Sequence, residues 1–304
     1  MWLSGNILEA EITARNSLIL WRKRNNRYGE GVCLPFLGLA LVACGREAEL
    51  AELTFRRSIL IWRDKIDQQG QSLVNSFLAQ YWLWLGQPSR ALSSAQYAWD
   101  CAQLSYSERD FIRSSRLHGE AALVLDDIIT ANERLYHSLK RTRAVNFIEE
   151  ELPALIALAK LHRLREEYDT ARELLDQVWD AAERGPYPLF HADALNVLAQ
   201  FERDQNHLEA AIAAATKAYQ KAWCDGPPYA YHYGLTNARK HLQELGAPEP
   251  QLPPFDPAQH EPMPEVELNP KDEFYVEETT ILMQGAVSKF TTPDLKFISS
   301  HKYP

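Results

Sequence analysis

The sequence predicts an all-α protein in which helical hairpins stack into a superhelical solenoid. The first observation is a copied segment: EITARNSLILWR at residues 11–22 returns as ELTFRRSILIWR at residues 52–63. The second is a pattern of small residues that recurs every forty residues, as in Ala91, Ala131, Ala171 and Ala211. A fixed period of about 20–50 residues is typical of stacked arrays, so both observations indicate one repeated unit.

Each unit carries small residues where two antiparallel helices must approach closely. Their spacing of three and four residues keeps them on one helix face. Since one hairpin buries only part of its apolar surface, neighbouring hairpins must stack to cover the rest. The series are Ala79, Gly119, Ala159 and Ala199 in the first helix, Ala98, Ser138, Val178 and Ala218 in the second, and the bulky Trp99, Leu139, Trp179 and Tyr219 beside them.

We expect hairpins at about 30–68, 71–106, 111–148, 151–185 and 190–224, with a closing helix at 232–246. Residues 8–24 form a half-unit ahead of them, because they match a second helix that has no first helix before it. Residues 1–246 are thus predicted to form the solenoid. A solenoid that begins in mid-repeat exposes an apolar face, so we expect residues 1–6, a neighbouring chain or a further part of a longer chain to cover it.

Residues 247–304 are predicted to form an extended tail, because residues 247–278 are rich in proline and acidic residues and proline interrupts helices. This tail is either a loosely ordered segment or an arm that docks on the solenoid or on a partner. Spaced apolar residues favour docking on the solenoid: Phe255, Met263, Val266, Leu268, Phe274 and Tyr275. Residues 279–304 have no evident partner.

The positions of the small residues, with Leu78, Leu158 and Leu198 just before those of the first helix, resemble the tetratricopeptide repeat. That resemblance implies a right-handed α-α superhelix. The usual period of that repeat is about 34 residues, so we expect the additional residues in longer second helices and in loops between units. His118 departs from the pattern because it stands where leucine is typical, and His162 and Glu202 depart four residues further along the first helix, where tyrosine or leucine is typical.

Residues 223–256, WCDGPPYAYHYGLTNARKHLQELGAPEPQLPPFD, also resemble the end of tetratricopeptide sensor arms in bacterial signal-transducing ATPases of the STAND class. The resemblance implies that related solenoids follow an ATPase module and sense a trigger by binding it directly. No GxxxxGK[ST] motif is present, so nothing in this sequence is expected to hold a triphosphate. An ATPase partner chain would fit a sensor arm that is supplied separately.

Catalytic, cofactor-binding and metal-binding residues are not expected. The sequence contains no HExxH or GxSxG motif, and its four scattered cysteines form no CxxC pair, which fits a reducing, cytoplasmic compartment. The histidines lie far apart: His118 and His162 occupy core positions, whereas His137, His191, His207 and His241 are expected on helix surfaces.

Nucleic acid and membrane partners are also not expected. A net charge of −9 disfavours general binding to phosphates, and the basic run from Arg22 to Arg27 falls at a helix end where the dipole favours cations. The longest apolar stretch, residues 32–44, is shorter than the roughly 20 residues of a membrane-spanning helix.

The tetratricopeptide resemblance implies a concave binding face formed by fixed positions of the first helices. An excess of basic side chains there predicts a positive groove suited to an acidic peptide or a terminal carboxylate, because arginine binds carboxylates bidentately. The alternatives are a solvated helix face or a groove filled by the acidic tail of the same chain. The projected residues are Gln80, Trp84, Arg113, Arg116, Glu120, Lys160, Arg163, Asn196, Gln200 and Arg203.

Together these features predict a non-catalytic scaffold or sensor module that binds a protein or peptide in the concave groove of the solenoid. The alternative is a ligand-responsive regulator that acts on nucleic acid through a partner protein.

Overall fold

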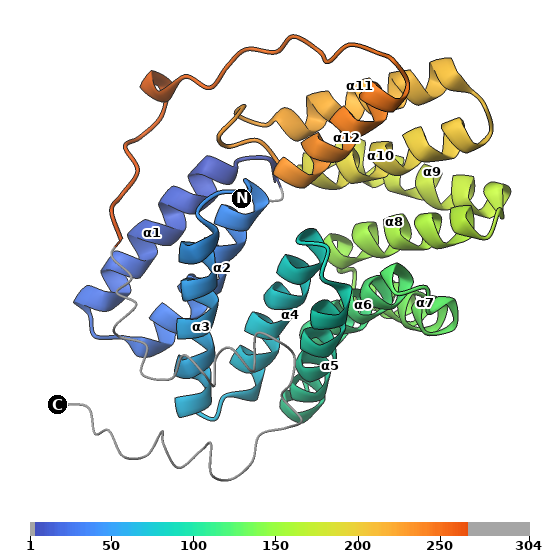
Figure 1. The fold of residues 1–304 in the computed structure, drawn as a ribbon. Helices are drawn as coiled ribbons and strands as arrows, with labels where there is room; N and C mark the ends of the chain where they lie inside the picture. Colours follow the sequence, from blue (N-terminus) through green and yellow to red (C-terminus); the bar gives the residue numbers. More distant parts are fainter. Residues whose placement is uncertain (1–3, 267–304) are drawn as a thin grey trace.

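A computed structural model describes residues 4–266 of the chain, except for the side chains of residues 180–184. Over these residues the fold is all-α and contains no strand, which confirms the predicted solenoid of helices (Figure 1). The elements are α1 (Ile7–Lys23), α2 (Arg27–Ala43), α3 (Ala48–Asp64), α4 (Gln68–Trp84), α5 (Pro88–Ser105), α6 (Glu108–Val124), α7 (Ile128–Ala144), α8 (Ile148–Leu164), α9 (Tyr168–Arg184), α10 (Pro188–Asp204), α11 (Leu208–Trp223), α12 (His232–Glu244) and the 3-10 turn η2 (Pro257–Gln259).

A left-handed residue ends almost every helix, at intervals of about twenty residues. After α6, for example, the N–H of Asp127 donates to the carbonyl of Ala122 at 2.9 Å and the N–H of Asp126 donates to that of Leu123 at 3.2 Å. Such a turn reverses the chain within three residues, so a helix of 17 residues repeats every twenty. The residues with positive φ at these helix ends are Asn25, Gly45, Ile66, Gly86, Tyr106, Asp126, Asn146, Glu166, Asn206, Cys224 and Gly246.

First and second helices have similar lengths, because α2, α3, α6, α7, α8 and α9 each contain 17 residues. The additional residues of the repeat are therefore shared by first and second helices rather than placed in the second helices alone. The first helices α2, α4, α6, α8, α10 and α12 contact one another in succession and form the inner layer of the solenoid. The alanines of the repeat are buried between the layers; Ala79, Ala91 and Ala131 are 0% exposed.

The copied segment forms α1 and α3, and the copy extends into the helix that follows each of them. Asn26 caps α2 by accepting from the N–H of Gly29 at 2.9 Å, and Asp67 caps α4 by accepting from that of Gly70 at 2.8 Å. In both places a tryptophan of the copied segment covers the glycine so closely that a Cβ atom would overlap its indole ring. What is repeated is therefore a whole unit: a helix, the capped turn after it and the contact between tryptophan and glycine.

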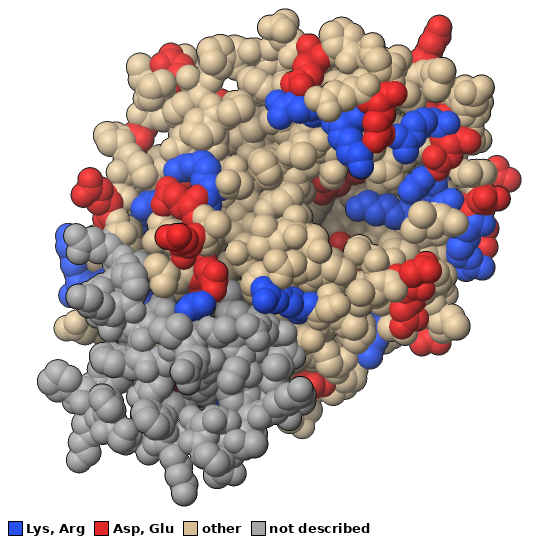
Figure 2. Space-filling model, viewed as in Figure 1, with Lys and Arg blue, Asp and Glu red and all other residues tan. Residues whose placement is uncertain are grey.

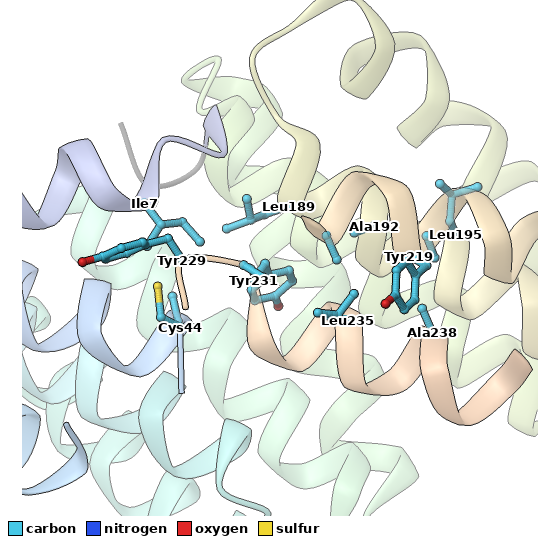
Figure 3. Packing of buried hydrophobic residues seen from close by; sticks show 14 of the residues in the cluster. Ile7, Cys44, Leu189, Ala192, Leu195, Tyr219, Tyr229, Tyr231, Leu235 and Ala238 are labelled. Carbon is cyan, nitrogen blue, oxygen red and sulfur yellow. The ribbon is translucent and has the colours of Figure 1, made fainter. Parts of the chain in front are cut away.

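The two ends of the solenoid meet, so the helices form a closed ring (Figure 1). Ile7, Leu8 and Ile12 of α1 join one apolar cluster with Leu189 of α10 and with Tyr229, in the loop between α11 and α12 (Figure 3). We call this group of five residues the closure seam. It answers the question raised by the half-unit, because the exposed face of α1 is covered by the other end of the same chain.

Polar contacts strengthen this junction. The guanidinium of Arg46, just after α2, lies 4.6 Å from the centre of the Tyr229 ring, a favourable cation–π arrangement. Its Nη1 atom also lies 3.1 Å from Oε2 of Glu11 in α1, a carboxylate that is fully buried. The loop between α11 and α12 is therefore held to both helices at the start of the ring.

The described part of the tail, residues 247–266, runs outside the ring past α11 toward α1 (Figure 1). Trp223 donates from Nε1 to the carbonyl of Pro253 at 2.9 Å, and the Phe255 ring lies 4.9 Å from that of Tyr229. Met263 and Val266 pack against buried clusters, so this segment docks on the outer surface rather than in the groove. Leu268, Phe274, Tyr275 and residues 279–304 lie outside the described residues.

Candidate functional site: the central cavity

The inner layer of the ring encloses a cavity of about 770 Å³, and Figure 2 shows the molecule hollowed there with basic side chains on one side. Residues of α1, α2, α4, α6, α8, α10 and α12 line it. Because the ends of the solenoid meet, the concave surface expected from the sequence has become the wall of this cavity. Its volume falls within the range of about 300–1,000 Å³ that is usual for small-ligand sites.

Six of the projected concave residues lie in the cavity wall: Gln80, Trp84, Arg113, Arg116, Glu120 and Lys160. Trp84 stacks on Tyr233 of α12, with ring centres 5.0 Å apart and planes inclined by 11°. The ring of Tyr231 lies 6.1 Å from that of Trp84. Trp84 therefore joins α4 to the far end of the solenoid as well as facing the cavity.

The other four projected residues contact neighbouring first helices or their ends. Nδ2 of Asn196 donates to the carbonyl of Gly234 at 3.0 Å, and Gln200 lies 3.4 Å from Nε2 of His241. Arg163 forms an ion pair with Asp204, and Arg203 forms one with Glu244. These contacts tie α8 to α10 and α10 to α12.

The arginines of the cavity are neutralised by carboxylates of the next first helix. Nε of Arg113 lies 2.8 Å and Nε of Arg116 lies 2.6 Å from the carboxylate of Glu150, and Arg116 also pairs with Glu120. Burial alone would raise the pKa of Glu150, but Arg116 and Arg113 outweigh it and hold that pKa below its usual range. Glu150 thus stays ionised, and the groove is not the stripe of unpaired cations that the projection suggested.

Lys160 of α8, Asp193 of α10 and Glu149 at the start of α8 line the cavity without an ion pair among the described residues. Among the described residues Lys160 forms no ion pair, although it is close enough to influence Asp193 electrostatically. The carboxyl of Asp193 accepts from the hydroxyl of Tyr231 at 3.0 Å. Burial raises the pKa of Asp193 to about 6, although Lys160 and Tyr231 act in the opposite direction.

The rest of the wall is largely apolar. Phe36 of α2 and Phe77 of α4 meet edge to face with ring centres 5.1 Å apart, and Phe36 remains 41% exposed toward the cavity. Leu83 and Phe190 also line the space. The cavity therefore combines aromatic surface with a few charged groups that form no ion pair among the described residues.

Sequence reasoning missed Asp193, Phe36 and Tyr231. A signal existed for two of them: Asp193 occupies the same repeat position as Arg113, and Phe36 the same position as Arg116, at multiples of forty residues. Tyr231 precedes the closing helix and corresponds to none of the projected concave positions of the repeat. It enters the cavity because the ring closes.

Histidines do not form a site within the described residues. His191 and His241, expected on helix surfaces, are buried at 8% and 5% exposure because α10 and α12 are covered by neighbouring elements. Nε2 of His162 lies within hydrogen-bond distance of the hydroxyl of Tyr136, at 2.8 Å, and its other ring nitrogen contacts Glu167. Burial raises the pKa of Tyr136, which keeps this hydroxyl protonated and makes it a poor nucleophile.

Over the described residues, no cluster of three or more His, Cys, Asp or Glu side chains is placed to hold a metal ion. In the same part of the chain, every helix is too short or too polar to cross a membrane. No protein-family model and no curated protein matches the sequence.

Proposed function

We propose that this protein is a non-catalytic binding or sensor module that holds a peptide ligand in its central cavity. The proposal follows the tetratricopeptide resemblance, in which the concave face binds peptides, and keeps the cytoplasmic setting that the cysteines favour. In the sensor form of the proposal, the ligand-bound ring acts on an ATPase supplied by a partner chain. The tail does not supply the ligand over residues 247–266, because these residues dock outside.

The observation that carries the proposal is the lining of the cavity. Aromatic side chains such as Phe36 supply apolar contact area, while Lys160 and Asp193 supply a few polar groups that orient a ligand. Such a mixture is typical of small-ligand and peptide sites. Preference for an acidic ligand has less support, because Arg113 and Arg116 are already paired with Glu150.

Photocrosslinking inside cells tests the proposal. The photoreactive residue p-benzoylphenylalanine replaces Phe36, which faces the cavity, and replaces the exposed Lys140 of α7 in a matched control. We expect a peptide adduct at position 36 that is absent at position 140. A further substitution, Gln80→Trp, adds bulk to the cavity wall and should abolish that adduct. Adducts that are identical at both positions, or that persist with Gln80→Trp, would contradict binding in the cavity.

A further inference from the structure

Two charged groups of the cavity, Lys160 and Asp193, are opposite in sign, influence each other electrostatically and form no ion pair among the described residues. Arg113 and Arg116 are held by Glu150 and Glu120, so a ligand gains little from them. Lys160 keeps its ammonium donors free of ion pairs within the described residues. Asp193 has two carboxyl oxygens, both within 3.2 Å of the single hydroxyl of Tyr231, which leaves lone pairs available to a further donor.

The two groups come from neighbouring first helices, because Lys160 lies in α8, Asp193 lies in α10, and these helices are in contact. Both side chains line the same cavity, so one ligand bound there has both groups in its surroundings. An anion alone would leave the carboxyl of Asp193 facing it, and a cation alone would be repelled by Lys160. A ligand with both charges satisfies both groups.

The size of the cavity limits the length of that ligand. Closure of the ring leaves about 770 Å³, a volume suited to a ligand of drug-like size rather than to a helix or a long extended segment. The apolar wall formed by Phe36, Phe77 and Phe190 provides a place for a bulky apolar side chain beside the charges.

We propose that the ligand is a small zwitterion with an apolar side chain, either a free amino acid or a peptide of a few residues with both termini free. Its carboxylate binds the ammonium of Lys160 and its ammonium binds the carboxylate of Asp193. This inference rests on the proposed function and names the class of its ligand. The raised pKa of Asp193 agrees with it, since burial outweighs the opposing effect of Lys160 and disfavours the charged form of a carboxyl that has no ion pair.

The experiment compares ligands that differ by one charge. Binding of phenylalanine, Phe-Leu and Phe-Leu-Phe to the full chain is measured by calorimetry and by intrinsic tryptophan fluorescence, to which Trp84 in the cavity wall contributes. The same peptides are tested with an acetylated N-terminus or an amidated C-terminus. We expect each cap to weaken binding by about tenfold or more, as removal of a charge-assisted hydrogen bond does. The best of the three lengths identifies whether an amino acid or a peptide is the ligand.

Two variants of the protein test which terminus of the ligand binds Lys160 and which binds Asp193. In Lys160→Met, amidation should weaken binding no further, whereas acetylation should still do so. Asp193→Asn retains an acceptor for Tyr231. In this variant acetylation should weaken binding no further, whereas amidation should still do so. Circular dichroism checks that both variants fold, and the capped ligands test the wild-type protein independently of that check. Caps without effect on the wild type, or no binding by any uncapped probe, would overturn the inference.

Failure of this inference can be distinguished from failure of the proposed function. If position 36 still gives an adduct that Gln80→Trp abolishes while none of the zwitterions binds, the cavity binds a peptide of another class. If that adduct is absent as well, the proposed function itself is wrong.

Discussion

At the scale of single residues, His118 shows how a polar side chain is tolerated in a core position of the repeat. The corresponding residues are Leu78 and Leu158, which are fully buried, and Leu198, which is partly buried. His118 is only 9% exposed, and its Nδ1 atom is buried without a hydrogen-bond partner among the described residues. Burial, with a contribution from Arg134, lowers the pKa of His118 to about 4. The imidazole is therefore neutral in the folded protein.

This pKa predicts how stability depends on pH. Because an unfolded histidine titrates near pH 6.5, the unfolded chain binds this proton first, and stability is lost as the pH falls from about 6.5 toward 4. His118→Leu should remove that loss, which amounts to about 2–3 kcal/mol, and should also remove the unsatisfied nitrogen. Urea unfolding at pH 7.5 and pH 4.5 measures the free energy of unfolding at each pH, and the difference gives the loss. The exposed control His207→Gln should keep the wild-type pH dependence, and an unchanged slope in His118→Leu would contradict the assignment.

Ile66 is a residue under local backbone strain. It adopts φ +54° in the turn after α3, a left-handed conformation that is unusual for a β-branched residue, and its side chain is 78% exposed. Ile66→Gly should therefore stabilise the protein by about 1 kcal/mol, because glycine reaches this region without a steric penalty. The control is the reverse change, Gly86→Ala. Gly86 has φ +66°, and a Cβ atom added there would meet nothing within 4 Å. This substitution should destabilise by a similar amount in thermal unfolding; equal melting temperatures would rule out backbone strain.

At the scale of elements, the contact between one helix and the next explains why the copied segment is so similar in its two occurrences. Trp62 of α3 is 1% exposed and covers Gly70 of α4, and Trp21 of α1 covers Gly29 of α2 in the same way. A second helix, a capped turn and a glycine thus act as one unit. The tryptophan requires the glycine, since no larger residue fits beneath the indole.

Gly70→Ala should therefore destabilise the protein by about 1–3 kcal/mol, as expected for overpacking, although alanine is the better helix former. Denaturant unfolding measures the change. In a Trp62→Leu background the same substitution should cost much less, because the indole is gone. Equal costs in the two backgrounds would show that the indole does not cause the effect.

The helices were predictable from the sequence because their period, their small residues and their turns are local signals. The predicted hairpins correspond to α2–α3, α4–α5, α6–α7, α8–α9 and α10–α11. Turn residues such as Asn25, Gly45 and Gly86 match their left-handed backbone, whereas Ile66 gives no such signal. The concave positions were projected from the repeat, but the pairing of Arg163 with Asp204 and of Arg203 with Glu244 depends on the side-by-side register of successive helices.

At the scale of the whole molecule, closure of the ring could not be predicted from local patterns. It requires small rotations between units to add up until Ile7 meets Leu189, residues that are remote in sequence. A repeat protein is otherwise stabilised by contacts between neighbours. The seam, together with the contacts of Arg46 and Trp84 with the far end, lets the two ends of the solenoid stabilise each other and converts an open concave surface into a cavity.

Ile7→Asp tests the seam selectively. Ile7 is fully buried in the seam but is the first residue of α1, where a carboxylate is favourable for the helix itself. A buried, unpaired carboxylate is costly, so the seam should open while the hairpins persist. We expect an increased radius of gyration in X-ray scattering, nearly unchanged helical circular dichroism and loss of cavity ligands. The control Leu158→Asp, fully buried in the middle of the solenoid, should instead reduce helix content. An Ile7→Asp ring of unchanged size would show that neighbour contacts alone set its curvature.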